Sequence, residues 1–378
     1  MSNRTSQESQ ERSRDSDAQE RLYLASQWQL IYRKFKQHRL ATAGTAVLAV
    51  LYVVSAFAEF ISPYDILERS KQRYSPPSRI RLVDAGGRFH LRPFVYGMVQ
   101  QRDPETWEIG YTEDTGERYP IRLFTRGAPY KLWSLLPMDR HLFGVEEPGR
   151  IFLFGTDKLG RDLFSRTVYA ARISLSIGLV GVAFSFVLGC ILGGISGYFG
   201  SKTDLVIQRI VEIFMSLPHI PLWIALAAAL PRGWSVIKTY FAITVILSLV
   251  GWTTLARVVR GKLISLREED FVLAARISGM RSGAIILRHL LPSFMSYLVV
   301  NLTLAVPSMI LGETALSFLG LGIRPPAVSW GALLKSAQQV NVVALYPWLL
   351  IPGLLVIVTV LAFNFVGDGL RDAADPYR

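Results

Sequence analysis

Residues that could do acid–base or metal chemistry are few in this 378-residue chain, and they do not gather. The five histidines are scattered, at His38, His90, His141, His219 and His289. No HxxxH or CxxC spacing and no cluster of carboxylates supports a metal site. The lone cysteine, Cys190, excludes an internal disulfide and lies in an apolar block, where it is expected to be a small packing residue. The sequence therefore predicts neither a catalytic site nor a metal site.

The stretch from Gly200 to Thr203 (GSKT) has the residue types of a phosphate-binding loop. It lacks the order Gly-Lys-Ser/Thr, and no strand precedes it to aim backbone amides at phosphates. A tight turn between two apolar segments is the better interpretation. We therefore expect no nucleotide or other cofactor in this chain.

Carboxylates close to the apolar blocks lie near their ends and not in their middle. Glu212, Glu313 and Asp368 are the examples. A proton-driven transporter is expected to place ionisable residues in mid-span, facing a cavity. Their absence from mid-span disfavours secondary transport and indicates that energy comes from elsewhere.

A second polar group, Asp157, Arg161 and Asp162, directly precedes a long apolar block. We favour an interfacial ion-pair cluster that fixes how the chain enters that block, and substrate contact is the alternative. Glu313 has two interpretations of equal standing. It lines an outer gate, or it pairs with an arginine at the membrane edge.

The apolar blocks that must position these residues dominate the composition. Hydrophobic residues make up 51% of the chain, and its mean hydropathy is +0.31. Blocks of about 20 apolar residues are long enough to cross a bilayer. We predict an all-α polytopic membrane protein with six spans, at about 41–61, 173–198, 207–230, 240–259, 294–312 and 348–366. Pro218 and Pro221 predict a kink or a local unwinding in the third span.

The basic residues set the predicted orientation. Lys and Arg concentrate before the first span and in the loop 257–290, so both termini and this loop are predicted to be cytoplasmic. The net charge of +12 then fits loops facing anionic lipid and disfavours a nucleic-acid partner.

The predicted organisation follows from these spans. It comprises a cytoplasmic tail with an amphipathic helix (1–40), a first span (41–61), an extracytoplasmic insert (62–172) that is β-rich at about 75–130, a five-span core (173–367) with a cytoplasmic loop at 260–292, and a cytoplasmic tail (368–378). Residues 1–20 are polar and are predicted to be disordered.

The second predicted span carries a small residue at every fourth position. These residues are Gly181, Ser185, Gly189, Gly193 and Gly197. One helix face is therefore nearly flat and allows close approach of another helix backbone, from this chain or another.

The loop at 260–292 is the polar segment with the clearest helix start and stop signals. Acidic residues before Phe271 favour a helix start, Gly279 a helix stop, and Ser282 the cap of a second short helix that ends at Leu291-Pro292. With Phe271, Val272, Ala275 and Ile286 available, the two helices could fill a groove on a partner protein. The equal alternative is that they rest on the membrane or on their own bundle.

This loop contains the pattern AAxxxGx₉HxLP, formed by Ala274, Ala275, Gly279, His289, Leu291 and Pro292. The pattern resembles the cytoplasmic signature of ATP-binding-cassette (ABC) importer permeases, EAAx₃Gx₉IxLP. Leu273 and His289 depart from that signature in a way familiar in the dipeptide/oligopeptide/nickel branch. Segments 155–162 (GTDKLGRD), 169–175 (YAARISL), 313–326 (ETALSFLGLGIRPP) and 369–376 (GLRDAADP) are also similar to that branch. The outer insert lies outside the resemblance.

The resemblance implies the type I importer permease fold and a second, C-type permease subunit in the bacterial inner membrane. It implies a homologous permease partner, two cytoplasmic ATPases that bind ATP and Mg²⁺, and an extracytoplasmic solute-binding protein. The loop would be the coupling helix pair that docks on an ATPase. Di- and oligopeptides are the first-choice solute, nickel or another small solute is the alternative, and a stand-alone secondary transporter is a distant one.

Overall fold

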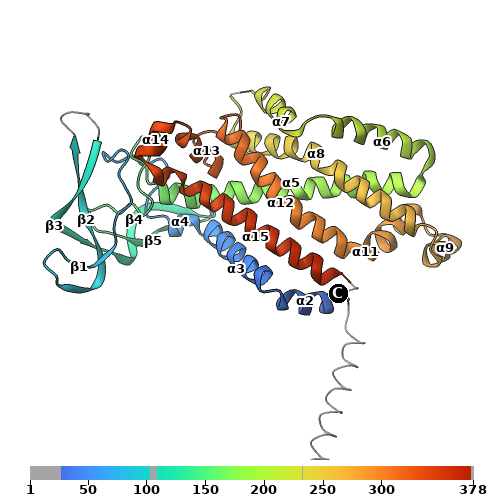
Figure 1. The fold of residues 1–378 in the computed structure, drawn as a ribbon, viewed down its shortest axis with the longest axis horizontal. Coiled ribbons are helices and arrows are strands. Elements are labelled where there is room, and N and C mark those ends of the chain that lie inside the picture. The colour runs from blue at the N-terminus through green and yellow to red at the C-terminus, as the bar shows by residue number, and fades with distance from the viewer. Residues whose placement is uncertain (1–26, 103–108, 232, 376–378) are drawn as a thin grey trace, which may run out of the picture.

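The computed structural model describes residues 27–102, 109–231 and 233–375. Figure 1 shows an elongated helical bundle with the strands gathered at one end and helix α9 at the other. We call these the insert end and the loop end. The predicted disordered segment 1–20 lies outside the described residues.

Five helices are long and apolar enough to cross a membrane, or six if one bent pair counts as a single span. The five are α3 (Arg39–Ala56), α5 (Leu163–Phe199), α8 (Val236–Leu266), α12 (Met295–Phe318) and the continuous stretch Pro347–Ala374, formed by η3 (Pro347–Leu350) and α15 (Ile351–Ala374). The bent pair is α6 (Ser201–Ser216) and α7 (His219–Ala228), with an angle of 86° between them. The break consists of Leu217 and Pro218, and Pro218 is one of the two prolines that predict a kink there.

Several helices continue beyond their apolar blocks. Helix α5 begins at Leu163, about ten residues before the predicted span, because Asp162 caps it and its first polar side chains are buried against the chain. Helix α8 continues past residue 259 through Arg260 and Lys262 to Leu266. Hydropathy locates the membrane-embedded part of a helix, whereas caps and side-chain contacts decide where it ends.

The insert contains two small antiparallel sheets. Strands β1 (Arg81–Val83), β2 (Phe89–Arg102) and β3 (Ile109–Pro120) form one sheet in sequence order. Strands β4 (Arg122–Leu132) and β5 (Leu136–Gly144) form a separate hairpin, in which Thr125 pairs with His141. The strands thus extend to 144, beyond the predicted limit of about 130, because Pro137 and the charged residues of β5 obscure its alternation.

Helix α5 is the centre of the bundle, and its small-residue face packs on α8 of the same chain. A Cβ atom at Gly193 would lie 2.4 Å from the carbonyl oxygen of Ala256, and one at Gly197 would lie 2.8 Å from that of Arg260. The hydroxyl of Ser185 donates to the carbonyl of Ser248 at 3.4 Å. The sequence left the partner of this face open, and the structure assigns it to α8.

Shorter helices complete the ends. At the loop end are α2 (Gln27–Gln37), α9 (Asp270–Ile277), α10 (Ser282–Ile285), the π-helical turn η1 (Ile286–Leu290) and α11 (Leu291–Ser293). At the insert end are α4 (Ala58–Ile61), α13 (Trp330–Leu334), η2 (Lys335–Ala337) and α14 (Val340–Leu345). Helix α2 lies beside the end of α15, where Lys34 donates to the carbonyl of Asp375 at 3.2 Å (Figure 1).

Candidate functional site

The inner face of α9 packs on the bundle. Val272 and Ala275, three residues apart, are buried in an apolar cluster with Leu255 and Leu263 of α8. Ile286 is buried in the same cluster. The expectation that Val272, Ala275 and Ile286 are available to a partner is therefore wrong. Their helical spacing turns them toward their own bundle, which was the alternative interpretation of the loop.

The outer face of α9 is apolar and unpartnered within the described chain. Ile277 is 88% exposed, and Phe271 and Leu273 are each exposed by more than 40%. Ala274 is also exposed, and Leu287 adds a further exposed apolar side chain from η1. Phe271, Leu273, Ala274, Ile277 and Leu287 form what we call the docking face. Sequence reasoning missed Ile277 and Leu287. Their spacing from the buried residues places them on a different helix face, and this spacing could have identified them.

The turn after α9 has the geometry that the sequence predicts. Gly279 has a φ of +76°, in the region that glycine adopts most readily, and Met280 donates its amide to the carbonyl of Ala275 at 3.1 Å. The predicted cap of the next helix is wrong. Ser282 lies inside α10, and the N-cap residue is Arg281, which makes no side-chain capping bond.

The second half of the loop contains a π-helical turn. It spans Ile286–Leu290, includes the half-buried His289, and precedes buried Leu291 and exposed Pro292. Pro292 has no amide hydrogen to donate to the carbonyl four residues earlier, which fits a wider turn at this place. The turn directs Leu290 and Leu291 into the bundle while Leu287 stays exposed.

Polar contacts fix α9 and its supporting helices at the loop end. The Arg276 guanidinium lies 5.0 Å from the centre of the Tyr198 ring and donates to its hydroxyl at 3.3 Å, which joins α9 to the last turn of α5. Arg260 of α8 donates to both carboxylate oxygens of Asp204 of α6, at 2.5 and 2.6 Å. Sequence reasoning singled out none of these contacts, because their partners are distant in the chain.

At the insert end, Asp157 and Arg161 form a compact cluster. Asp157 is buried, and its carboxylate accepts from the amides of Leu159 at 2.8 Å and Arg161 at 3.0 Å. The Arg161 guanidinium donates to it at 2.7 Å, and the Arg166 guanidinium lies 3.9 Å away. These contacts are those expected of a group that fixes the entry into α5.

Asp162 is the N-cap of α5. Its Oδ2 atom accepts from the amide of Ser165 at 2.7 Å and from its hydroxyl at 2.6 Å. Its Oδ1 atom is buried without a hydrogen-bond partner among the described residues. Burial raises the pKa of Asp162 to about 6, against the opposing effect of the hydrogen bonds from Ser165.

Glu313 of α12 is fully buried and bonded to hydroxyl groups. Ser317 donates to it at 2.6 Å and Ser174 of α5 at 3.3 Å. Within the described residues it forms no ion pair with an arginine, so that expectation is wrong. The interpretation of Glu313 as an outer-gate residue also conflicts with its burial, since it faces the α5–α12 contact.

A bidentate ion pair at the insert end escaped sequence reasoning. Arg172 of α5 donates to both carboxylate oxygens of Glu59 of α4, each at 2.7 Å. It also donates to the carbonyls of Ser55 at 3.2 Å and Ala56 at 3.1 Å. One arginine therefore satisfies the last carbonyls of α3 and connects α3, α4 and α5.

A cavity of about 930 Å³ opens at the break between α6 and α7. Its walls come from the break and from α12, and include His219, Trp223, Ser308 and Gly312. The Nε1 atom of Trp223 is buried without a hydrogen-bond partner among the described residues. A broken helix at membrane depth is expected where its backbone is covered by protein or lines a water-filled cavity.

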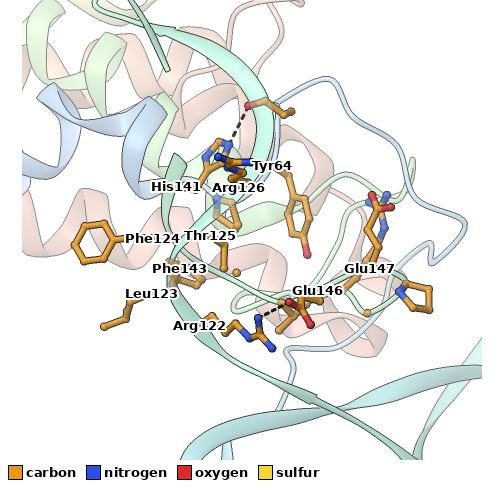
Figure 2. Close-up of a pocket in the computed structure, with 18 of the residues that line it drawn as sticks. Tyr64, Arg122, Leu123, Phe124, Thr125, Arg126, His141, Phe143, Glu146 and Glu147 are labelled. Atoms are coloured by element: carbon orange, nitrogen blue, oxygen red, sulfur yellow. Dashed lines mark hydrogen bonds and ion pairs between the residues drawn. The ribbon is translucent and has the colours of Figure 1, made fainter. Parts of the chain in front are cut away.

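A second cavity, of about 1070 Å³, lies in the insert and is bordered by β4, β5 and the segments around Tyr64 and Glu146. Figure 2 shows Arg122 paired with Glu146 at one side and His141 at the other. Arg150 and Glu68, also at its wall, lie 2.8 Å apart. These charged groups neutralise one another, so the cavity presents no single sign of charge to a ligand.

Within the described residues, no group of three or more histidine, cysteine, aspartate or glutamate side chains could hold a metal ion. The predicted turn at Gly200 to Thr203 is confined to Gly200, which alone separates α5 from α6, and Ser201 to Thr203 form the first turn of α6.

Two family models match the chain. The model described as "Binding-protein-dependent transport system inner membrane component" covers residues 185–377. The model described as "N-terminal TM domain of oligopeptide transport permease C" covers residues 26–77.

Curated relatives extend the match. The oligopeptide transport system permease protein OppC of Bacillus subtilis (strain 168) is 38% identical over 248 residues, which cover 65% of this chain and 77% of that protein. The dipeptide transport system permease protein DppC of the same strain is 31% identical over 368 residues, 97% of this chain and 91% of that protein. A structure of the inward-facing MetNI methionine ABC transporter has a TM-score of 0.43 and 20% identity, and covers 56% of this chain and 97% of that chain.

Proposed function

We propose that this chain, which belongs to the family of binding-protein-dependent transport system inner membrane components, forms half of the membrane pathway of an ATP-driven peptide importer. It is a C-type permease of the oligopeptide and dipeptide branch, and it is a transport subunit, not an enzyme. The observation that carries this conclusion is the family match over 185–377, which includes the loop, three of the five apolar helices in full, part of α5, and the bent pair α6–α7.

The proposed assembly contains a homologous permease, two ATPases and a solute-binding protein. In this arrangement the loop end and both termini face the cytoplasm, and the insert faces the binding protein's side. The concentration of basic residues at the loop supports that orientation. ATP and Mg²⁺ bind to the ATPases, and their closure moves the permease helices through the loop.

The docking face is the proposed contact with an ATPase. An apolar surface at the tip of a helix pair is unfavourable in water and favours a groove on a partner. The buried inner face, with Val272 and Ala275, makes α9 rigid with α8, so that force applied to the docking face reaches the spans.

Replacing Ile277 by Asp tests this contact. A charged group in an apolar groove costs several kcal/mol, so we expect ATP-dependent peptide uptake to fall more than tenfold and the ATPases to be lost during purification of the complex. Uptake is measured in proteoliposomes containing the whole importer. Because Ile277 is almost fully exposed, folding and membrane insertion should be unchanged.

Ile277→Leu is the matched control, because it keeps the apolar volume and should retain both uptake and ATPase binding. If Ile277→Asp binds the ATPases and transports like the control, the docking face is assigned wrongly.

The cavity at the α6–α7 break is the proposed solute-contacting part of this subunit. Its walls are mostly apolar, with a few polar groups, as expected for a passage that accepts varied side chains. The unpartnered Trp223 Nε1–H can donate to a peptide carbonyl, and Gly312 leaves room for the indole, since a Cβ there would lie 3.1 Å from the ring.

Trp223→Phe removes this N–H and keeps an aromatic ring. One hydrogen bond contributes about 1 kcal/mol, so uptake at low peptide concentration should fall about fivefold to tenfold. ATP hydrolysis stimulated by the binding protein should not change.

Trp234→Phe, at an exposed tryptophan outside the cavity lining, is the matched control and should leave uptake unchanged. Equal uptake by the two variants would exclude Trp223 Nε1 as a solute contact.

A further inference from the structure

The turn of the β4–β5 hairpin carries an exposed apolar segment. Residues 131–138 read KLWSLLPM, and Ser134 is the single polar residue between Leu132 and Met138. Leu135 is 78% exposed, and Trp133, Leu136 and Met138 are also exposed. We call residues 132–138 the hairpin tip. Other apolar side chains of the insert, such as Phe89 and Leu91, are also exposed, but the tip is a run of five apolar residues broken only by Ser134 and Pro137, and a contiguous apolar surface of this kind marks an interaction site.

The backbone of the tip is held in an unfavourable conformation. Trp133 and Ser134 have φ values of +51° and +62°, and Leu135 donates its amide to the carbonyl of Leu132 at 3.0 Å. Two consecutive left-handed residues make a hairpin turn that favours Asn and Gly. Tryptophan at this place costs about 1–2 kcal/mol, so its side chain must gain contacts elsewhere.

One such contact connects the tip to a membrane helix. The Trp133 indole donates from Nε1 to the carbonyl of Ala56 at 2.7 Å, and its ring lies 5.4 Å from that of Phe57. Ala56 is the last residue of α3, and α4 continues to Ile61. At 1.5 Å per helical residue, the contact lies about 7 Å below the end of this helical segment, toward the middle of the bundle. Figure 1 shows α4 between α3 and the β4–β5 hairpin.

The surface of α3 at this depth is apolar and exposed. Val50, Val53 and Phe57 are exposed, and the Trp133 ring packs beside Phe57. In a span, such a surface faces lipid chains or a neighbouring membrane subunit. A tryptophan at the end of a span, with its N–H bonded to a carbonyl, is typical of the boundary between headgroups and acyl chains.

We propose that the hairpin tip is a lipid anchor, inserted into the leaflet on the insert's side of the membrane. Trp133, Leu135 and Leu136 enter the boundary between headgroups and acyl chains, which apolar anchors reach to a depth of about 5–10 Å. Exposed Lys131 stands at the base of the tip and places its ammonium group among phosphate headgroups. The anchor fixes the hairpin, and with it the cavity that β4 and β5 border, against the bilayer surface. It does not depend on the solute or on the ATPases.

Nitroxide scanning in lipid nanodiscs tests the proposal. Cys190 is the only cysteine, so Cys190→Ala gives a background into which Leu135→Cys, or Leu136→Cys if the first fails to fold, is introduced and spin-labelled. The nanodiscs contain phosphatidylethanolamine and phosphatidylglycerol. Leu91→Cys, at an exposed position of β2, is the matched control.

At the tip we expect frequent collisions with oxygen, which concentrates in lipid, and a loss of collisions with a water-soluble nickel chelate. The control should show the reverse. If the nickel chelate reaches the tip as freely as the control, the hairpin stands in water and the proposal is wrong. Protection of the tip from both reagents would also overturn it, because protein and not lipid would then cover the tip.

Discussion

The two ends of the bundle are each closed by a bidentate arginine–carboxylate pair, and the two pairs differ in their surroundings. At the insert end, Arg172 binds Glu59, whose side chain is 10% exposed, and also two backbone carbonyls of α3. At the loop end, Arg260 binds Asp204, whose side chain is 20% exposed and has a second donor in Ser196. The Glu59 carboxylate is therefore less accessible to water than Asp204 and lacks a second side-chain donor among the described residues, although its arginine is the more exposed of the two, at 38% against 30%.

The two ends also differ in how polar their supporting contacts are. The inner face of α9 is buried in an apolar cluster, whereas the entry to α5 combines an apolar cluster around Leu163 with the polar group of Asp157, Arg161 and Asp162. Under the proposed function the loop transmits motion, which requires a firm apolar contact with its helices and few bonds that must break. A fixed entry point tolerates a rigid polar cluster. This difference predicts that mutations at the two ends have unequal costs.

Arg172→Met should have the largest effect on stability. It leaves Glu59 and the Ser55 carbonyl without their donor, whereas the Ala56 carbonyl keeps its bond from Trp133, and for a mostly buried carboxylate this costs about 3 kcal/mol. The apparent melting temperature of the purified permease in detergent measures the loss. Arg172→Lys keeps the charge and part of the bonding and should lose clearly less. A loss as small as that from the Arg260 variant described below would remove the contrast between the ends.

Asp162→Asn should have an intermediate effect that depends on pH. Because burial raises the pKa of Asp162 to about 6 from about 4 in the unfolded chain, the folded state binds the proton more tightly. This contribution to stability is present below pH 4 and is lost as the pH rises to 6, by about 2 kcal/mol.

Asparagine is neutral and can still accept from the Ser165 amide, so it should remove this pH dependence and keep the cap. The measurement compares the unfolding of the two proteins at pH 4, 5, 6 and 7. Parallel stability curves would show that Asp162 is not the titrating group.

Arg260→Met should have the smallest effect on stability, about 1 kcal/mol, because Asp204 keeps its bond from Ser196 and can be hydrated. Thermal unfolding under the conditions used for Arg172→Met gives the direct comparison. A loss equal to that of Arg172→Met would mean that the loop end is as rigidly bonded as the insert end.

Much of the bundle could be predicted because apolar length and small-residue spacing are local properties. The family signature in the loop and the break at Pro218 are likewise local. Which side chains of the loop at 260–292 are buried was less predictable. Phe271, Val272 and Ile286 are all apolar, and only the packing of α9 and η1 on the bundle separates the exposed Phe271 from the two buried residues. Strand β5 was missed because its charged, proline-containing sequence gains regular structure by pairing with β4.

The sequence by itself determined that this chain crosses a membrane several times, that one helix has a flat face, and that its loop has the signature of its family. These conclusions depend on hydropathy and spacing, which neighbours in the chain define. Only the tertiary structure decided that α8 covers the flat face and that Ile277 and Leu287 are exposed. It also decided that Arg172 bonds to Glu59, 113 residues away. Such contacts depend on how helices distant in sequence are oriented, and no local pattern specifies that orientation.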